Sequence, residues 1–256
     1  KTSDMKSTKG APCTCMNSAQ KRTAHMPPIN AAGYHVILRT VRVFKSCHAA
    51  KMKVSRTTAA DIDMGREIIC MLLNLGIEIT NKKLEQLEKY YELLIEYNKV
   101  MNLTRITEEK DVYLKHFYDS LTIVKAINLT KIETLCDVGT GAGFPGIVLK
   151  IVYPNLKITL VDSLLKRVNY LNSIINELEL DNIKAIHTRG EDLKETFDIV
   201  TARAVANIEK LLTYTMHLVN KDGLFIAMKG NIDEELTTEV LSKINKKHKI
   251  IKIEKF

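Results

Sequence analysis

The sequence has no tryptophan, five cysteines, and no apolar run that approaches the about 18 residues needed to cross a membrane. The cysteines, Cys13, Cys15, Cys47, Cys70 and Cys136, form no CxxC pair. Their number and spacing suit neither a disulfide framework nor a metal site. These absences predict a protein without membrane spans or bound metal, in a reducing compartment that we expect to be the cytoplasm.

Acidic side chains are scarce near the start of the chain. Residues 1–63 contain 11 basic and 3 acidic residues and no glutamate, whereas the rest holds 27 of each sign. The net charge of +8 therefore belongs to residues 1–63 and says little about the remainder. We expect this segment to be a disordered extension, with Met64 as a plausible native start. An organelle transit peptide and an RNA-binding arm are the alternatives, and Tyr34–Phe44 is its one candidate strand.

Residues 64–130 have apolar side chains at helical spacing. A first stretch ends at Gly76, Thr80 or Asn81 can cap a second helix, and a third begins at Glu108. The tyrosines of the second helix follow the same spacing and are expected to pack in a core rather than to stack on bases. This pattern predicts an N-terminal helical subdomain.

Residues 131–256 alternate between short apolar strands and amphipathic helices. Such alternation implies right-handed crossovers and a parallel sheet covered on both faces. We therefore predict an α/β, doubly wound, Rossmann-like domain. The expected strands are TLCDVG, KITLVD, IKAIH, FDIVTA, GLFIAMK and KHKIIKIEKF.

The loop DVGTGAGFPG, Asp137–Gly146, follows the first of these strands. Glycines there allow close approach of a ligand to the backbone, although a structural turn would use them too. A dinucleotide GxGxxG pattern would need glycine where Phe144 stands, and no Lys-Ser/Thr pair follows Gly146 as a Walker loop requires. Asp162 ends the second strand about 20 residues after Gly139, where an acid can accept from ribose hydroxyls. The loop favours S-adenosylmethionine, with NAD as the alternative.

At this point the sequence resembles a known family. The stretch DVGTGAGFPGIVLKIVYPNLKITLVDSLLKRVNYL is similar to the RsmG (GidB) family, bacterial methyltransferases that act on guanine N7 in 16S ribosomal RNA. NKVMNLTRIT, HFYDSL, TRGEDL, TARAVANIEKLL and MKG match in the same order, over about residues 67–230. That family ends in a further antiparallel strand, which we expect to be missing here, and no family motif accounts for residues 1–63.

The resemblance implies a binding role for residues at the carboxyl ends of the strands. Three glycines and the adjacent phenylalanine would lie beside the methionine part of S-adenosylmethionine, an acid would hold the ribose, and a glycine–glutamate pair would flank the adenine. In that order these residues are Gly139, Gly141, Gly143, Phe144, Asp162, Gly190 and Glu191.

The resemblance also implies residues near the acceptor. Arg203 would lie near both the cofactor and the incoming guanine, as a candidate for positioning the substrate. Lys166, Arg167 and Lys229 are candidates for RNA contacts, although a solvated basic face explains lysines equally well. His116 is expected to pack between helices rather than to act in catalysis, and the sequence identifies no catalytic base.

The missing residue types agree with attack by guanine N7. Methylation of cytosine C5 uses a cysteine after the fourth strand, where this chain has TARAVAN, and no Asp/Asn-Pro-Pro-Tyr motif for exocyclic amines occurs. Guanine N7 carries a lone pair and no proton, so it needs no base. We therefore predict a monomeric methyltransferase acting on an unpaired guanine of 16S rRNA or the small ribosomal subunit particle. A non-catalytic RNA-binding assembly factor, or a methyltransferase for protein or small molecules, is the alternative.

Overall fold

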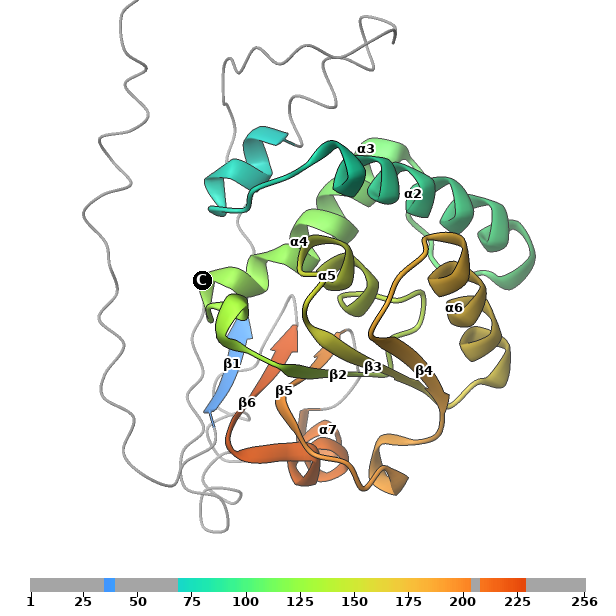
Figure 1. The fold of residues 1–256 in the computed structure, drawn as a ribbon. Helices are drawn as coiled ribbons and strands as arrows, with labels where there is room; N and C mark the ends of the chain where they lie inside the picture. Colours follow the sequence, from blue (N-terminus) through green and yellow to red (C-terminus); the bar gives the residue numbers. More distant parts are fainter. Residues whose placement is uncertain (1–34, 40–68, 204–207, 229–256) are drawn as a thin grey trace, which may run out of the picture. The chain divides into compact units, whose positions relative to one another are not determined.

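The structure is a computed structural model that describes residues 35–39, 69–203 and 208–228, all within one compact unit over residues 32–256. Its centre is a parallel sheet of six strands in the order β1-β6-β5-β2-β3-β4, which confirms the predicted doubly wound α/β fold (Figure 1). The strands are β1 (His35–Arg39), β2 (Thr134–Val138), β3 (Lys157–Asp162), β4 (Ile183–His187), β5 (Phe197–Arg203) and β6 (Val219–Met228).

The strand order reverses at β2. From β2 the chain builds outward through β3 and β4 on one side, and then through β5 and β6 on the other. The loops that leave the carboxyl ends of β2 and β5 therefore diverge from a common point. In open sheets of this kind the ligand binds at such a reversal, because the diverging loops leave a crevice there.

Two apolar layers cover the sheet because side chains alternate along each strand. Leu135 of β2 faces a layer with α5 (Gly146–Val152) and α6 (Leu165–Glu177). Cys136, the next residue, faces the opposite layer with α7 (Ile208–Thr215). Figure 1 shows α5 and α6 on one side of the sheet and α7 on the other. The predicted cover on both faces is thus confirmed.

The N-terminal helices extend the first of these layers. Residues 69–74 are helical, and α2 (Asn81–Met101) packs outside α5 and α6. The Thr80 hydroxyl caps α2 by accepting from the backbone N–H of Lys83, as the sequence predicts. Tyr90 and Leu94 of α2 are fully buried in the same core as the sheet. The helices of residues 64–130 therefore share a core with the α/β part, and a subdomain boundary near residue 130 stays a prediction.

The third helical stretch changes its winding part-way. It runs through α3 (Glu109–Val112), a π-helical segment (Tyr113–Tyr118), α4 (Asp119–Leu121) and a 3₁₀ turn (Thr122–Lys125). The sequence predicts a helix here but not the π winding, since periodicity cannot show where a backbone carbonyl finds a partner outside the helix. Those partners come from β5, which lies more than 80 residues further along the chain.

The last predicted strand in the described residues begins earlier than expected. The sequence predicts this strand from Gly223, but α7 ends at Thr215 and a 3₁₀ turn, Met216–Leu218, leads straight into β6 at Val219. The KDG residues lie in a bulge of β6, where the five-residue step from Val219 to Leu224 pairs with the two-residue step from Phe197 to Ile199 of β5. The bulge takes up the extra residues, so the strand continues through the glycine, which local turn propensity does not anticipate.

Two expectations concern the ends of the chain. The candidate strand Tyr34–Phe44 contains β1, which pairs in parallel with β6. The KHKIIKIEKF strand and the missing antiparallel strand lie outside the described residues, as does the rest of the expected N-terminal extension. Across the described ranges, no helix is both long and apolar enough to cross a bilayer.

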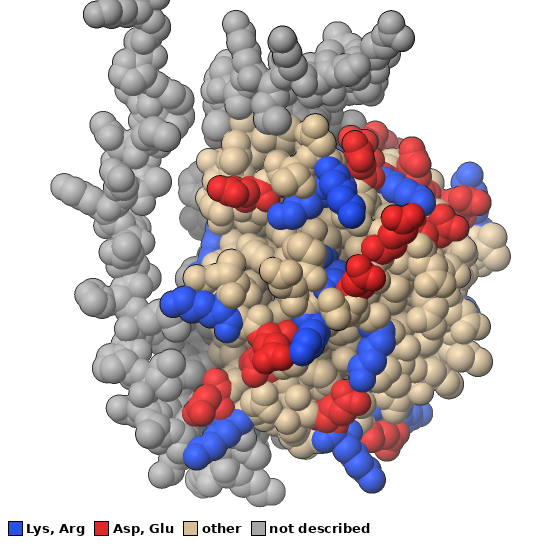
Figure 2. All heavy atoms as spheres, viewed as in Figure 1, with Lys and Arg blue, Asp and Glu red and all other residues tan. Residues whose placement is uncertain are grey.

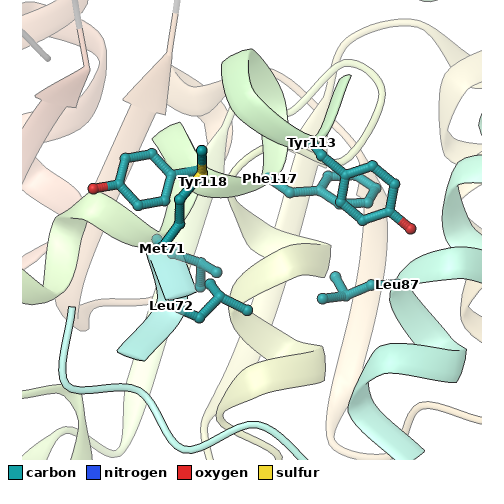
Figure 3. A pocket seen from close by; sticks show the side chains of 7 residues that line it. Met71, Leu72, Leu87, Tyr113, Phe117 and Tyr118 are labelled. Carbon is teal, nitrogen blue, oxygen red and sulfur yellow. The ribbon is translucent and has the colours of Figure 1, made fainter. Parts of the chain in front are cut away.

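A small hollow lies between the N-terminal helices and the π-helical segment (Figure 3). Its volume of about 10 Å³ has room for one water molecule at most. Its lining is almost entirely apolar, so this hollow is a packing defect rather than a ligand site. It is lined by Met71, Leu72, Leu87, Tyr113, Phe117, Tyr118 and Leu121.

Lys150 is a buried lysine that joins α5 to the following turn. Its side chain is 2% exposed, and Nζ donates to the carbonyl oxygens of Pro154 and Leu156, each at 2.6 Å. These carbonyls have no strand or helix partner of their own in that turn. The ammonium group thus satisfies the buried Leu156 carbonyl, which would otherwise be left unpaired, and also the partly buried Pro154 carbonyl.

Replacing this lysine should destabilise the fold. Lys150→Met keeps the apolar stem but leaves the buried Leu156 carbonyl, and the partly buried Pro154 carbonyl, without this donor, so we expect a loss of about 2 kcal/mol in the free energy of unfolding. Lys157→Met is the control, because Lys157 is exposed and solvent screens its ion pair with Glu133, so its loss should be small. Urea unfolding measures both, and equal losses would contradict the buried role of Lys150.

Candidate functional site

The glycine loop after β2 opens onto the crevice at the strand reversal. Gly139, Gly141 and Gly143 have φ values of 69°, 59° and 103°, a region that other residues rarely adopt. Gly139 is exposed and Gly141 half-exposed, and a Cβ built on Gly141 would meet only the Gly139 carbonyl oxygen, at an ordinary contact distance of 4.0 Å. Gly143 is buried, and a Cβ there would lie 2.5 Å from Cδ1 of Ile147. The loop therefore turns bare backbone toward the crevice and packs its last part against α5.

A buried carboxylate at the end of β2 holds this loop in place. Asp137 accepts from the Thr140 hydroxyl at 2.6 Å and from the Gly146 N–H at 2.9 Å, both through Oδ2. Its Oδ1 accepts from the Thr201 hydroxyl of β5 at 3.2 Å. Burial raises the pKa of Asp137 to about 6, although these hydrogen bonds and Arg203 act in the opposite direction. One side chain thus joins the strand, the loop, the start of α5 and the neighbouring strand.

Asp162 joins the loop to the end of β3. Its carboxylate accepts from the N–H groups of Gly141 at 3.0 Å and Leu164 at 2.9 Å, and Nη1 of Arg167 lies 3.4 Å away. The side chain is 3% exposed. A carboxylate has about four acceptor positions, so lone pairs remain for ribose hydroxyls. A ribose would have to approach from the crevice side, or displace Arg167.

The adenine side of the predicted site lies at the next strand. Gly190 begins a 3₁₀ turn, Gly190–Asp192, just after β4, and a Cβ there would lie 3.0 Å from Cγ1 of Val138. Glu191 is exposed beside it. Because β4 follows β3 in the sheet, the structure brings Gly190 and Glu191 to the same edge as Asp162 and the glycine loop.

The N-terminal helices form the back wall of the glycine loop. The hydroxyl of the buried Tyr90 donates to the Ala142 carbonyl at 2.7 Å, and the Tyr170 hydroxyl reaches the same oxygen at 3.4 Å. The Phe144 ring, 6% exposed, points inward and stacks on the His116 ring, with centroids 4.6 Å apart. In this structure Phe144 therefore anchors the loop to the helices.

Arg203, the last residue of β5, reaches across to the same helices. Its Nη2 lies 3.0 Å from Oδ2 of Asp119 and 3.3 Å from Nδ1 of His116, and it donates to the Lys115 carbonyl. Its Nη1 lies 3.5 Å from the His116 carbonyl oxygen. The guanidinium carbon is 5.8 Å from the centroid of the Phe144 ring. Arg203 thus lies beside Phe144 of the loop, but its terminal nitrogens face the helices.

His116 must be neutral to make its two side-chain contacts. Arginine is only a donor, so Nδ1 of His116 accepts from Arg203, and Nε2 carries the hydrogen that faces the Thr104 hydroxyl at 2.8 Å. Burial and the neighbouring charge of Arg203 lower the pKa of His116 to about 4. His116 packs between elements, in line with the expectation, and it also contacts Arg203, which the sequence could not show.

Two of the three predicted RNA-contact residues lie in the described part of the chain, both in the first turn of α6. Lys166 is exposed on the first turn of α6, whereas Arg167 turns toward Asp162. Lys229 lies outside the described residues. On the face drawn in Figure 2, basic and acidic side chains alternate. Over the described ranges, no three His, Cys, Asp or Glu side chains come together in a way that could hold a metal ion.

The sequence matches a known family along two thirds of its length. The profile of the GidB family, described as rRNA small subunit methyltransferase G, matches residues 83–255. The chain belongs to this family. The matched residues begin in α2 and include the glycine loop, Asp162 and Arg203.

Relatives in several bacteria carry the same name, ribosomal RNA small subunit methyltransferase G. The protein of Staphylococcus saprophyticus is 52% identical over 165 residues, which are 62% of this chain and 69% of the relative. That of Bacillus velezensis is 48% identical over 177 residues, 66% of this chain and 74% of the relative. That of Bacillus subtilis is 46% identical over 170 residues, 64% and 71% respectively.

Partial matches to solved structures of more distant proteins are also found. A methyltransferase from Aquifex aeolicus, described as SAM-dependent, has a TM-score of 0.38 at 21% identity, covering 49% of this chain and 78% of that one. An O-methyltransferase segment called StiE has a TM-score of 0.46 at 16% identity and covers 57% and 58%. The family assignment rests on the sequence relatives alone.

Sequence reasoning located the strand ends but missed the residues that connect them. The sequence places Asp137 at the end of an apolar strand, a position that indicates a buried acceptor, but it does not show which donors surround the carboxylate. Asp119 lies within the HFYDSL motif, and the sequence gives it no role. Tyr90 was expected only to pack, and nothing in its neighbourhood in sequence indicates a bond to Ala142.

The two inner glycines should respond differently to alanine. In Gly143→Ala the Cβ would collide with Ile147 and with the Tyr90 hydroxyl at 2.8 Å, so we expect a loss of about 3 kcal/mol in the free energy of unfolding. In Gly141→Ala the Cβ makes only an ordinary contact with the Gly139 carbonyl oxygen, so backbone strain of about 1 kcal/mol is the main cost. Thermal unfolding should distinguish the two variants. Gly141→Ala should fold but bind S-adenosylmethionine more weakly, because of the position of its Cβ. Equal stability losses would count against this loop geometry.

The neutral state of His116 should make stability depend on pH. An unfolded histidine takes up a proton near pH 6.5, whereas folded His116 resists protonation down to about pH 4. The unfolded state therefore binds more protons between these values, and stability is lost as pH falls through this window. His116→Gln lacks this pH-dependent contribution to stability. Asp137, whose raised pKa changes stability with pH in the opposite direction, is present in both proteins. We expect the stability advantage of the wild type to shrink by about 1 kcal/mol between pH 7.5 and 5. A constant difference in unfolding temperature would show that His116 titrates normally.

Proposed function

We propose that this protein transfers a methyl group from S-adenosylmethionine to N7 of a guanine in small-subunit ribosomal RNA. The observation that carries the proposal is the outward-facing glycine backbone at the strand reversal, in a chain whose relatives are named small subunit methyltransferase G. A crevice with bare backbone on one side and an acid on the other suits a cofactor that has a ribose and no phosphate.

The residues of the loop and of two strand ends fit this cofactor. Gly139 and Gly141 would lie beside its methionine part, Asp162 would accept from the ribose, and Gly190 with Glu191 would flank the adenine. When bound, S-adenosylmethionine supplies a methyl group on a positively charged sulfur, which is open to in-line attack. The protein contributes mainly by holding donor and acceptor in line, since this displacement gains most from positioning.

The chemistry of the crevice suits an acceptor that needs no activation. Both cysteines in the described part of the chain, Cys70 and Cys136, are buried. Cys136 faces the α7 layer, away from the glycine loop, and burial raises the pKa of its thiol far above the ordinary range. A thiolate nucleophile for cytosine is therefore not supported. Guanine N7 offers its own lone pair, so positioning beside the loop suffices.

The target guanine should be unpaired. N7 faces the major groove, which in A-form RNA is too deep and narrow for protein side chains. Lys166 on the exposed first turn of α6, together with Arg167 and Lys229, would contact phosphates around the site. The substrate would be 16S rRNA or the small-subunit particle, in the bacterial cytoplasm, with one protein chain acting alone.

The proposal is tested by mapping N7-methylguanine in small-subunit RNA. The full chain is incubated with S-adenosylmethionine and with subunits from a strain that lacks its own methyltransferase of this family. We expect one new N7-methylguanine in 16S rRNA, and a loss of at least about tenfold in cofactor affinity for Asp162→Asn, because a charged acceptor of ribose is removed.

Three outcomes would contradict this assignment in different ways. Cofactor binding by calorimetry with methyl transfer only to protein or small molecules would point to another acceptor. RNA binding without cofactor binding would point to a non-catalytic assembly factor. An unchanged methylation map despite binding of both would contradict the acceptor chosen here.

A further inference from the structure

The π-helical segment and the first residue of α4 hold the side chain of Arg203 in a group of acceptors, the arginine receptor. Four acceptors converge on the guanidinium of Arg203: the carbonyls of Lys115 and His116, Nδ1 of the His116 ring and the carboxylate of Asp119. A π turn widens the helix, which lets carbonyls turn aside toward outside donors. The unusual winding therefore has a partner, and the partner lies at the end of β5.

The ion pair within this receptor is largely withdrawn from solvent. The side chains of Arg203 and Asp119 are 18% and 23% exposed, and their closest atoms lie 3.0 Å apart. Burial raises the pKa of Asp119, while Arg203 lowers it. A buried pair of this kind holds its geometry well, because removing either partner leaves an uncompensated charge. The same pair at an exposed site would be free to separate.

The receptor also fixes the orientation of the loop residue Phe144. The Phe144 ring stacks on His116 at an interplanar angle of 19°, and Arg203 lies near the same ring. Thr104 holds the far side of the His116 ring at 2.8 Å. Arginine, histidine and phenylalanine thus support one another at the point where the glycine loop meets the end of β5.

We propose that His116 and Asp119 are positioning residues for methyl transfer, which orient Arg203 and, through Phe144, the acceptor side of the glycine loop. This inference rests on the proposed function. The terminal nitrogens of Arg203 are used by the receptor, and Nε makes no hydrogen bond with the described residues. The orientation of the guanidinium therefore depends on Asp119 and His116, and so does the direction in which Nε–H points near the acceptor.

The test compares Asp119→Asn, His116→Gln and Arg203→Ala with the wild type, using the full chain and small ribosomal subunits. Methyl transfer is measured at saturating S-adenosylmethionine and saturating subunits, well below the unfolding temperatures. Cofactor affinity is measured separately by calorimetry. We expect kcat to fall about tenfold or more in each variant, because small misplacements of reacting groups carry large kinetic costs. The cofactor affinity should change less than threefold.

Two further variants separate positioning from general stability. Asp111→Asn is the matched control, since Asp111 pairs with Lys115 on the same helical stretch but at an exposed site. It should leave kcat unchanged. Asp119→Glu keeps the charge and should recover part of the activity that Asp119→Asn loses. If Asp119 acts through Arg203, adding Asp119→Asn to Arg203→Ala should cause no further loss in kcat.

The outcomes distinguish this proposal from the proposed function. A wild type that methylates the RNA beside an Asp119→Asn variant with lower stability but unchanged kcat would overturn the positioning role and leave the function intact. Additive losses in the double variant would also overturn it. A wild type that leaves the RNA unmethylated would contradict the proposed function and this role together.

Discussion

The structure depends on one buried carboxylate. Asp137 stands at the end of the central strand, where β2, the glycine loop, the start of α5 and β5 all meet. A carboxylate is costly to bury, and the cost is offset only when donors surround it. Here the donors come from the loop, from the start of α5 and from β5, so the carboxylate keeps its place only while all three keep theirs. The shape of the crevice follows from this shared requirement.

The N-terminal helices hold the middle of the glycine loop, which Asp137 does not contact. The carboxylate fixes the two ends of the glycine loop, at Thr140 and Gly146, whereas Tyr90 holds the middle through the Ala142 carbonyl. The inward Phe144 ring then joins the loop to His116. The helices are therefore part of the loop's support rather than a separate attachment, and their core is continuous with that of the sheet. A loop held on both sides is pre-organised to receive a ligand.

Much of the fold was predictable because its signals are local. The alternation of apolar strands and amphipathic helices follows from periodicity, and the positive φ values of Gly139, Gly141 and Gly143 require a residue without a Cβ. The cap at Thr80 is equally local. The π winding near His116 and the bulge of β6 at KDG were not predictable, since each depends on a strand distant in sequence.

The succession of strands along the chain, the glycine loop and the acid at Asp162 can be predicted from the sequence, because each follows from periodicity or from the properties of a single residue. The direction in which the side chains around the crevice point cannot be predicted in this way. Phe144 turns inward and the terminal nitrogens of Arg203 turn toward Asp119, and both choices are set by contacts with residues that lie more than 25 positions away in the chain. Packing and charge pairing act between neighbours in space, and those neighbours exist only once the sheet and helices have assembled.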